Sequence, residues 1–382
     1  MIKEAYIKMI NEERLLNTFL ELVQIDSETK DESKISQVLK QKFADLGVDV
    51  YEDDAAEKTG HGAGNLICTL KGTNSNADPI YFTSHMDTVF PGKGVKPFIK
   101  DGYVVSDGTT ILGADDKAGL AAIFESIQVL KENNIEHGDL QFIITVGEES
   151  GLVGAKALDS SKVFAKYGYA LDSDGEVGTI IVAAPTQARI QATLYGKSAH
   201  AGVAPEKGIS AITMAAKAIS KMPLGRIDEE TTANIGRFEG GQATNIVCEK
   251  VDVLAEARSL VGEKLEGQVE KMKNAFEQTA IEMGGRAEVD VKVMYPSFKF
   301  SSEDLVVQIA EAAAKKIGRE SKLLTSGGGS DANVIAGYGI PTVVLGVGYE
   351  EIHTTNERMP IKELNKLAEM VLAIIETVNE RN

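Results

Sequence analysis

The sequence has few cysteines and no long hydrophobic run, and both absences narrow what the protein can be. Only Cys68 and Cys248 occur among 382 residues, and neither lies in a CxxC pair. We therefore expect buried free thiols in a reducing compartment, without disulfides or a cysteine metal clip. No stretch approaches the roughly 20 apolar residues that a membrane-spanning helix needs. Residues 1–16 lack the apolar core of a secretion signal, so we expect a cytoplasmic protein with no membrane partner.

Basic residues are also scarce relative to acidic ones. The chain has 40 Lys and Arg against 57 Asp and Glu, a formal net charge of -17. Such a charge repels phosphate backbones and anionic lipid surfaces, so no nucleic acid partner is expected. Solubility is the simplest explanation of the acidity, and steering of cationic substrates is the alternative. No repeat or low-complexity tract interrupts the chain, which predicts a fully folded protein.

Length and hydrophobic pattern predict a larger domain that carries an inserted smaller one. Short apolar strands alternate with amphipathic helices before residue 186 and again after 296, which predicts an α/β fold with a mostly parallel sheet and helices on both faces. Between them, alternating segments at 189–195 and 251–257 and two helices predict an α+β domain with one solvated sheet face. We therefore predict a discontinuous catalytic domain, residues 1–185 and 297–382, and an inserted lid, residues 186–296. Expected strands of the larger domain include 48–51, 65–70, 80–84, 140–146, 169–172 and 341–345, with a helix over 117–130.

Acidic residues and histidine follow several of the predicted strands. Ligands of such sheets gather at the carboxyl ends of the strands, so these side chains should converge. Several carboxylates at one edge would repel and raise each other's pKa values unless a cation lay among them. One imidazole with several carboxylates favours zinc, with manganese and cobalt as alternatives. The residues concerned are His85, Asp87, Asp115, Asp116, Glu148, Glu149 and Asp172.

Each cluster also has a simpler interpretation. A single His-x-Asp is usually an ordinary hydrogen-bonded pair, and Asp115-Asp116 would serve as a helix cap. A second metal site needs another imidazole, and His353, which follows a predicted strand, is the natural candidate among five histidines. We expect His61, in a Gly-rich loop, and His137, in a polar turn, to lie on the surface.

Five short motifs stand out along the chain. They are His-Met-Asp-Thr-Val at 85–89, Gly-Ala-Asp-Asp-Lys-Ala-Gly at 113–119, Gly-Glu-Glu-Ser-Gly at 147–151, Gly-Lys-Ser-Ala-His-Ala-Gly at 196–202 and Gly-Gly-Gly-Ser-Asp at 327–331. Together they resemble the motifs of the dinuclear zinc peptidase family, and the likeness covers essentially the whole chain in the expected order. This family includes peptidase T, carboxypeptidase G, aminoacylase and succinyl-diaminopimelate desuccinylase, and the sequence is most similar to its peptidase T-like members.

The resemblance implies a metallopeptidase that hydrolyses amide bonds of small peptides with two bridged divalent cations, normally zinc. His85 and Asp172 would hold one metal, Glu149 and His353 would hold the other, and Asp115 would bridge them. The family's cis peptide bond would follow this bridging aspartate.

Two more residues acquire roles from the same resemblance. Asp87 would contact His85 without binding the metal itself and would thereby orient the imidazole ring. Metals about 3.5–4 Å apart would share a water whose pKa falls toward about 7, and Glu148 would be the general base for the resulting hydroxide.

The lid motifs imply a homodimer and a substrate site. The histidine matching His200 stabilises the oxyanion in the partner subunit's active site in this family; the simpler alternative is that His200 ends a strand. Asn245 and Arg258 match substrate-binding positions, and Arg258 is the candidate for gripping a terminal carboxylate. Gly328 would offer its backbone to substrate. A plain surface role remains the alternative for Asn245 and Arg258.

The sequence also bears on other classes of protein and on other substrates. Gly60-His-Gly-Ala-Gly precedes a strand, whereas a dinucleotide fingerprint follows one, and Gly329-Ser-Asp lacks the nucleophile elbow of a serine hydrolase. A non-catalytic metal-dependent binding protein is a remote alternative, because the ligands and Glu148 are all present. No acid that would recognise a free amine is evident, and the 196–202 motif is more similar to the carboxypeptidase and aminoacylase branches. A carboxypeptidase or N-acyl-amino-acid hydrolase is therefore the main alternative to a tripeptidase.

Overall fold

The computed structural model describes residues 9–381, so half of the segment in which we expected no secretion signal lies outside the described residues. The chain divides into two compact units. Unit 1 comprises the described residues up to Val182, Phe300–Thr325 and those from Ser330 on; unit 2 comprises Ala183–Lys299 and Ser326–Gly329. The main segment of unit 2 begins and ends three residues outside the predicted insertion of 186–296. The short return at 326–329 was not expected.

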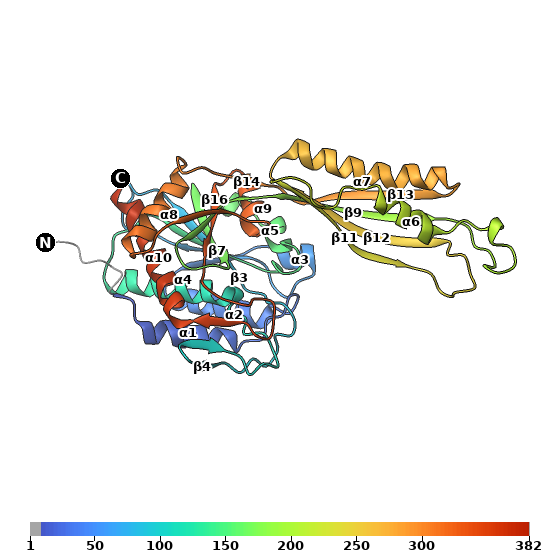
Figure 1. The fold of residues 1–382 in the computed structure, drawn as a ribbon. Helices are drawn as coiled ribbons and strands as arrows, with labels where there is room; N and C mark the ends of the chain where they lie inside the picture. The colour runs from blue at the N-terminus through green and yellow to red at the C-terminus, as the bar shows by residue number, and fades with distance from the viewer. Residues whose placement is uncertain (1–8, 382) are drawn as a thin grey trace. The chain divides into compact units, whose positions relative to one another are not determined.

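Unit 1 is built on a nine-stranded mixed sheet with a parallel centre (Figure 1). The four central strands, in the order β6-β3-β7-β16, run parallel to one another, and antiparallel strands flank them. Every residue of β3, β6 and β16 is buried, as is typical of parallel strands covered on both faces. The order across the sheet is β1 (Asp49–Glu52), β2 (Leu66–Leu70), β6 (Leu140–Thr145), β3 (Ile80–His85), β7 (Tyr167–Ser173), β16 (Thr342–Gly346), β8 (Thr179–Ala184) and β14 (Phe298–Lys299), with β15 (Lys322–Thr325) paired to β8.

Helices cover both faces of this sheet, which confirms the predicted fold class. Alternation along β3 sends Phe82 into the main core and Tyr81 into a smaller core on the opposite face. On the larger side, Phe43 of α2 stacks on Phe142 of β6 at 6.0 Å between ring centroids. On the smaller side, Ile335 of α9 packs with Tyr81. The larger side carries α1 (Glu12–Val23), α2 (Ser33–Asp45), α4 (Ala114–Glu132), α8 (Leu305–Lys316) and α10 (Ile361–Glu380); the short α3 (Ala55–Thr59), α5 (Val153–Ala157) and α9 (Asp331–Gly337) complete the unit.

A separate small sheet lies in unit 1 beside the loop that follows β16. It consists of three antiparallel strands in the order β17-β5-β4. The strands are β4 (Phe98–Lys100), β5 (Tyr103–Val105) and β17 (Arg358–Pro360).

Unit 2 is an antiparallel sheet with two helices on one face. The register pairs Ala188, Ile190, Ala192 and Leu194 of β9 with inward residues of both neighbours, and these side chains form a second core with the helices. The opposite face carries exposed polar side chains. The strand order is β10 (Gly225–Arg226), β11 (Thr231–Gly240), β12 (Lys250–Ser259), β9 (Thr186–Tyr195) and β13 (Arg286–Tyr295), and the helices are α6 (Ala211–Ser220) and α7 (Gly262–Glu282) (Figure 1).

A helix that spans a bilayer must be both long and apolar. Within residues 9–381, every helix is too short or too polar to span a membrane.

Candidate metal centre

The parallel strands of unit 1 bring the predicted ligands to one edge of the sheet. His85 is the last residue of β3, and Asp172 lies next to the end of β7. Glu149 follows β6, and His353 follows β16. Because these four strands are adjacent and parallel, their carboxyl ends meet at the same place.

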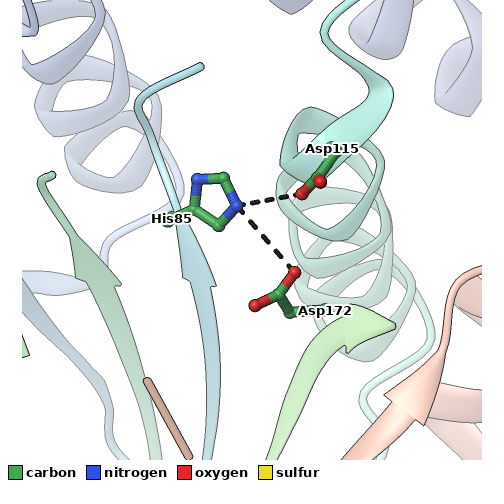
Figure 2. Close-up of side chains that lie close together, drawn as sticks. All are labelled: His85, Asp115 and Asp172. Carbon is green, nitrogen blue, oxygen red and sulfur yellow. Dashed lines mark hydrogen bonds and ion pairs between the residues drawn. The ribbon is translucent and has the colours of Figure 1, made fainter. Parts of the chain in front are cut away.

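One group of ligand atoms consists of His85, Asp115 and Asp172 (Figure 2). His85 Nε2 lies 3.0 Å from Asp115 Oδ1 and 3.9 Å from Asp172 Oδ1. The imidazole is almost completely buried, at 2% exposure. One nitrogen and two carboxylate oxygens, all within 4.8 Å of one another, form a donor set that suits a borderline divalent cation.

A second group shares Asp115 with the first. Asp115, Glu149 and His353 offer ligand atoms that also lie within 4.8 Å of one another. His353 Nε2 lies 3.3 Å from Asp115 Oδ2 and 3.0 Å from Glu149 Oε1. The two oxygens of Asp115 therefore face two different imidazoles. This is the arrangement that one carboxylate needs in order to bridge two cations.

Asp87 connects His85 to the turn that carries the two glutamates. His85 Nδ1 lies 2.9 Å from the backbone oxygen of Asp87 and 3.5 Å from its Oδ1. The Asp87 carboxylate also accepts hydrogen bonds from the backbone N–H groups of Glu148, at 3.0 Å, and Glu149, at 3.3 Å. Since Asp87 is fully buried, these contacts fix both the ring tautomer and the turn.

Local backbone geometry presents Asp115 to the histidines. Gly113 has φ of +76°, and the Asp115–Asp116 peptide bond is cis, as the family resemblance implied. Neither aspartate has helical angles, so the regular part of α4 begins at Lys117. Asp116 Oδ1 accepts a hydrogen bond from the Gly119 N–H at 3.3 Å. The helix-cap interpretation therefore holds for Asp116 and is wrong for Asp115.

Glu357 is a buried residue of the site that the sequence reasoning missed. Its carboxylate accepts hydrogen bonds from the backbone N–H groups of Leu112, Gly113 and Asp115, at 2.8, 2.7 and 3.1 Å. It lies four residues after His353, so one loop supplies both an imidazole and the hydrogen bonds that hold the backbone at Asp115. In the sequence, Glu357 could be suspected only because it is an acidic residue in the loop that contains the predicted ligand His353.

The charges of the site explain its pKa shifts. Hydrogen bonds to Asp115 and Glu149 raise the pKa of His353 to about 10. Burial would lower the pKa of His85, but Asp115 and Asp87 raise it well above its usual range. Burial, reinforced by neighbouring carboxylates, raises the pKa values of Glu148 and Asp172. These shifts show that the crowded carboxylates favour bound protons as counter-charges. A divalent cation would stabilise the same negative charge, so the residues fit a metal centre.

Two histidines that we expected on the surface are buried. His61 is 8% exposed and His137 is 5% exposed. His61 Nε2 lies 2.9 Å from Ser150 Oγ, and His137 Nδ1 lies 2.7 Å from the backbone oxygen of Gly138. The prediction was wrong because neighbouring elements cover both segments, and each buried ring has at least one hydrogen-bond partner.

The remaining predicted residues lie in unit 2, where they form two groups. His200 and Asn245 are exposed and adjacent: His200 pairs with Ile246 in an isolated bridge, and the Ala201 N–H donates to Asn245 O at 3.0 Å. Strand β9 ends at Tyr195, so the alternative that His200 ends this strand is wrong.

The second group joins Arg258 to the short return that contains Gly328. Arg258 Nη1 donates to Gly327 O at 2.9 Å. Its Nε and Nη2 donate to the two carboxylate oxygens of Glu256 at 3.0 and 3.1 Å. The bidentate face of Arg258 is therefore already occupied by a carboxylate of the same strand, which the sequence analysis did not foresee.

Fold and site together define a class, a metal-dependent hydrolase with two adjoining ligand sets and a carboxylate shared between them. Comparison with known proteins names the family. Residues 81–377 match the model of peptidase family M20/M25/M40, and the chain belongs to this family. The predictions of the family and of a peptidase are thus confirmed.

Individual relatives are similar over nearly their whole length. A crystal structure of aminopeptidase PepT from Bacillus cereus shares 71% identity and a TM-score of 0.93, covering 97% of this chain and 100% of that one. A tripeptidase structure from Staphylococcus aureus shares 58% identity and a TM-score of 0.95, with coverage of 97% and 100%. The protein YqjE of Bacillus subtilis is 74% identical over 96% of this chain and 99% of its own.

Replacing Glu357 with glutamine should weaken metal binding by about 10–100-fold, the usual effect of losing a hydrogen-bonding partner behind a metal ligand. The amide NH₂ of glutamine would face a backbone N–H, so at least one of three hydrogen bonds to the Asp115 loop would be lost. Competition with a calibrated chelator would measure the affinity. Exposed Glu303 provides a matched Glu-to-Gln control. Equal affinity in the Glu357 and Glu303 variants would contradict the supporting role.

Proposed function

We propose that this protein is a cytoplasmic, zinc-dependent exopeptidase of the peptidase T type that releases terminal residues from small peptides, with tripeptides as preferred substrates. The observation that carries this proposal is the position of Asp115, whose two carboxylate oxygens face His85 and His353 separately. The similarity to the aminopeptidase and tripeptidase structures supports the substrate class.

The proposed ligands follow the two groups of side chains. His85 and Asp172 would hold one cation, Glu149 and His353 the other, and Asp115 both. The mixture of nitrogen and oxygen donors favours zinc, with cobalt or manganese as substitutes. When bound, such cations polarise a carbonyl and lower the pKa of a water molecule.

Glu148 is the proposed general base and acid. Its backbone N–H is held by Asp87, next to Glu149, so its carboxylate belongs to the same turn as a ligand. Burial and the nearby Asp172 raise its pKa, which increases its affinity for a proton. Glu148 would take the proton of the attacking water and deliver a proton to the leaving amine.

His200 is proposed to stabilise the oxyanion across a homodimer interface. Its Nδ1 accepts a hydrogen bond from the Gly202 N–H at 3.2 Å, so the neutral ring carries its proton on Nε2, where it can be donated to substrate. Exposed apolar side chains near it, Val203 at 77% and Ile246 at 46%, support a protein partner for this part of unit 2. Asn245, paired with this segment, is proposed to contact substrate.

The ion pair between Arg258 and Glu256 bears on which end of the peptide is recognised. An arginine that bound a free terminal carboxylate would use the fork that Glu256 occupies. The ion pair therefore favours a peptidase that does not rely on Arg258 alone to bind the terminal carboxylate of its substrate. A carboxypeptidase or N-acyl-amino-acid hydrolase is the second candidate, and it requires Arg258 to exchange Glu256 for substrate. The backbone of Gly328 would line the same group.

A matched series of one tripeptide tests the proposal: free, N-acetylated and C-amidated forms assayed with zinc-loaded protein. We expect kcat/KM to fall at least tenfold on acetylation, because a peptidase T-type enzyme reads the free amine, and to change less on amidation. The reverse order would select the carboxypeptidase or acylase candidate. A metal-loaded protein that hydrolyses no member would favour the remote alternative, a metal-dependent binding protein.

A further inference from the structure

The loop between α3 and β2 contains a buried histidine to which the proposed reaction assigns no role. This loop, residues 60–64, begins at Gly60, which has φ of +74°, and turns the chain from α3 toward the sheet. His61 is buried within it, and its side chain is only 3% exposed. A buried imidazole carries a desolvation cost, so its hydrogen bonds indicate what it supports.

Hydrogen bonds fix the orientation of the His61 ring. Thr59 Oγ1 donates to Ala55 O at 2.7 Å, so it accepts from His61 Nδ1, 3.0 Å away. On the other side of the ring, Nε2 lies 2.9 Å from Ser150 Oγ, and the Ser150 hydroxyl donates to the backbone oxygen of Gly147 at 3.1 Å. The buried Glu32 holds the same loop by accepting from the Gly62 N–H at 2.8 Å. The ring is therefore a fixed support on the side of α3.

The supported element is the turn that carries the two glutamates of the metal centre. A Cβ added at Gly147, the first residue of this turn, would lie 2.5 Å from His61 Nε2 and 2.7 Å from its Cδ2. The ring therefore lies directly against the backbone of Gly147 and also bonds Ser150. Glu148 and Glu149 are the two residues between these contacts.

The turn is thus held from two directions. Asp87 binds the backbone N–H groups of Glu148 and Glu149, whereas His61 contacts the residues that flank them. Backbone hydrogen bonds from Gly151 and Leu152 to Glu148 O join the turn to the chain that follows it, and the His61 contacts add a second side-chain support. A rotation of the turn would move a metal ligand and the proposed base together.

We infer that His61 is a positioning residue that, through Ser150 and Gly147, fixes the carboxylates of Glu148 and Glu149 at the metal centre. The inference rests on the proposed function for its effect on catalysis. Its effect on metal binding requires only that Glu149 be a ligand.

Replacing His61 with phenylalanine tests this role, because it keeps a buried ring and removes both hydrogen bonds. We expect about tenfold weaker binding of the second Co²⁺ equivalent, followed by visible absorption, and a kcat lower by about tenfold or more with KM within about twofold. His61→Gln places an amide near the position of Nε2 and should restore both quantities to within about threefold. Ser150→Ala should resemble His61→Phe, and the double variant should be no worse than either single one.

A matched control separates positioning from general loss of a buried histidine. His137, equally buried and bonded to Gly138 O, should tolerate substitution by phenylalanine with unchanged Co²⁺ binding and kcat. Equal losses in the His61 and His137 variants, or wild-type Co²⁺ affinity in both His61→Phe and Ser150→Ala, would overturn the inference. If His61→Phe fails to fold, Ser150→Ala decides by the same measurement. Wild-type protein that binds two Co²⁺ ions but cleaves no peptide would sink the proposed function, while the affinity comparison would still judge His61.

Discussion

The Glu148→Gln variant should bind two metal ions as the parent protein does and lose about 10²–10⁴-fold in kcat, the range that general acid–base catalysis supplies. Glutamine keeps the size of the side chain and the backbone N–H that donates to Asp87, 3.0 Å away. The proposed ligands His85, Asp115, Asp172, Glu149 and His353 are untouched. The loss should therefore appear in turnover and not in metal content.

Metal analysis and single-turnover kinetics on the same sample would separate these effects. Glu57, exposed on α3, provides a Glu-to-Gln control that should retain full activity. Full turnover in the Glu148 variant would exclude it as the base. Loss of one metal would instead make Glu148 a ligand, a role that its proximity to His85 and Glu149 permits.

Removing the metal ions should abolish turnover and destabilise the fold, most of all at alkaline pH. A site occupied at about 1,000 times its Kd contributes about 4 kcal/mol to stability. For a chain of 382 residues, whose entropy of unfolding is about 0.8 kcal/mol/K, that corresponds to a fall in Tm of about 5 °C for each site. Differential scanning calorimetry of chelator-treated and reloaded protein between pH 6 and 10 would measure both effects.

The direction of the pH effect follows from the shifted groups of the metal-free site. The raised pKa of His353, about 10 instead of 6.5, gives stability that is complete below 6.5 and is lost as the pH rises toward 10. The raised pKa values of His85, Glu148 and Asp172 act in the same direction. The pKa of Asp115 is lowered by its two histidines against the effect of burial, so its contribution is lost only in acid.

Bound cations would replace the protons in the loaded protein, so its stability should vary less over the same range. Calcium would serve as a control for ionic strength, because it prefers oxygen ligands. Parallel Tm curves for the metal-free and zinc-loaded protein from pH 6 to 10 would refute the electrostatic account. Full activity after chelation would refute the metal requirement itself.

The sequence was sufficient to predict those parts of the structure that depend on local pattern. Alternation of short apolar strands and helices predicted the α/β fold, because parallel strands buried on both faces are rich in apolar residues, as at 343–345 in β16. Most candidate ligands were found because they follow such strands, whereas Asp115 lies at the start of α4. His353 was selected by its position after β16, and the structure brings it within 3.3 Å of Asp115.

The residues that support the site were not predictable in this way. Glu357 and His61 act on backbone atoms of segments far away in the chain, and no periodicity or spacing records such contacts. The ion pair of Arg258 with Glu256 follows from their same-face positions on β12, but whether neighbours on a strand pair with each other or with substrate depends on tertiary surroundings. Strand β13 was missed although Ala287, Val289, Val291 and Val293 alternate there with charged residues, as they should in a half-exposed strand.

The place of β16 in the sheet has a consequence for the order of events during biosynthesis. This strand lies between β7 and β8, although more than 150 residues of chain separate it from either. On the ribosome, the centre of the sheet therefore stays incomplete until nearly the whole polypeptide has emerged, whereas the main segment of unit 2 is contiguous and can fold earlier. His353 emerges later still, so a nascent chain can assemble the His85, Asp115 and Asp172 group before the group that contains His353. A cation held by the group that contains His353 would then be acquired after one held by His85, Asp115 and Asp172.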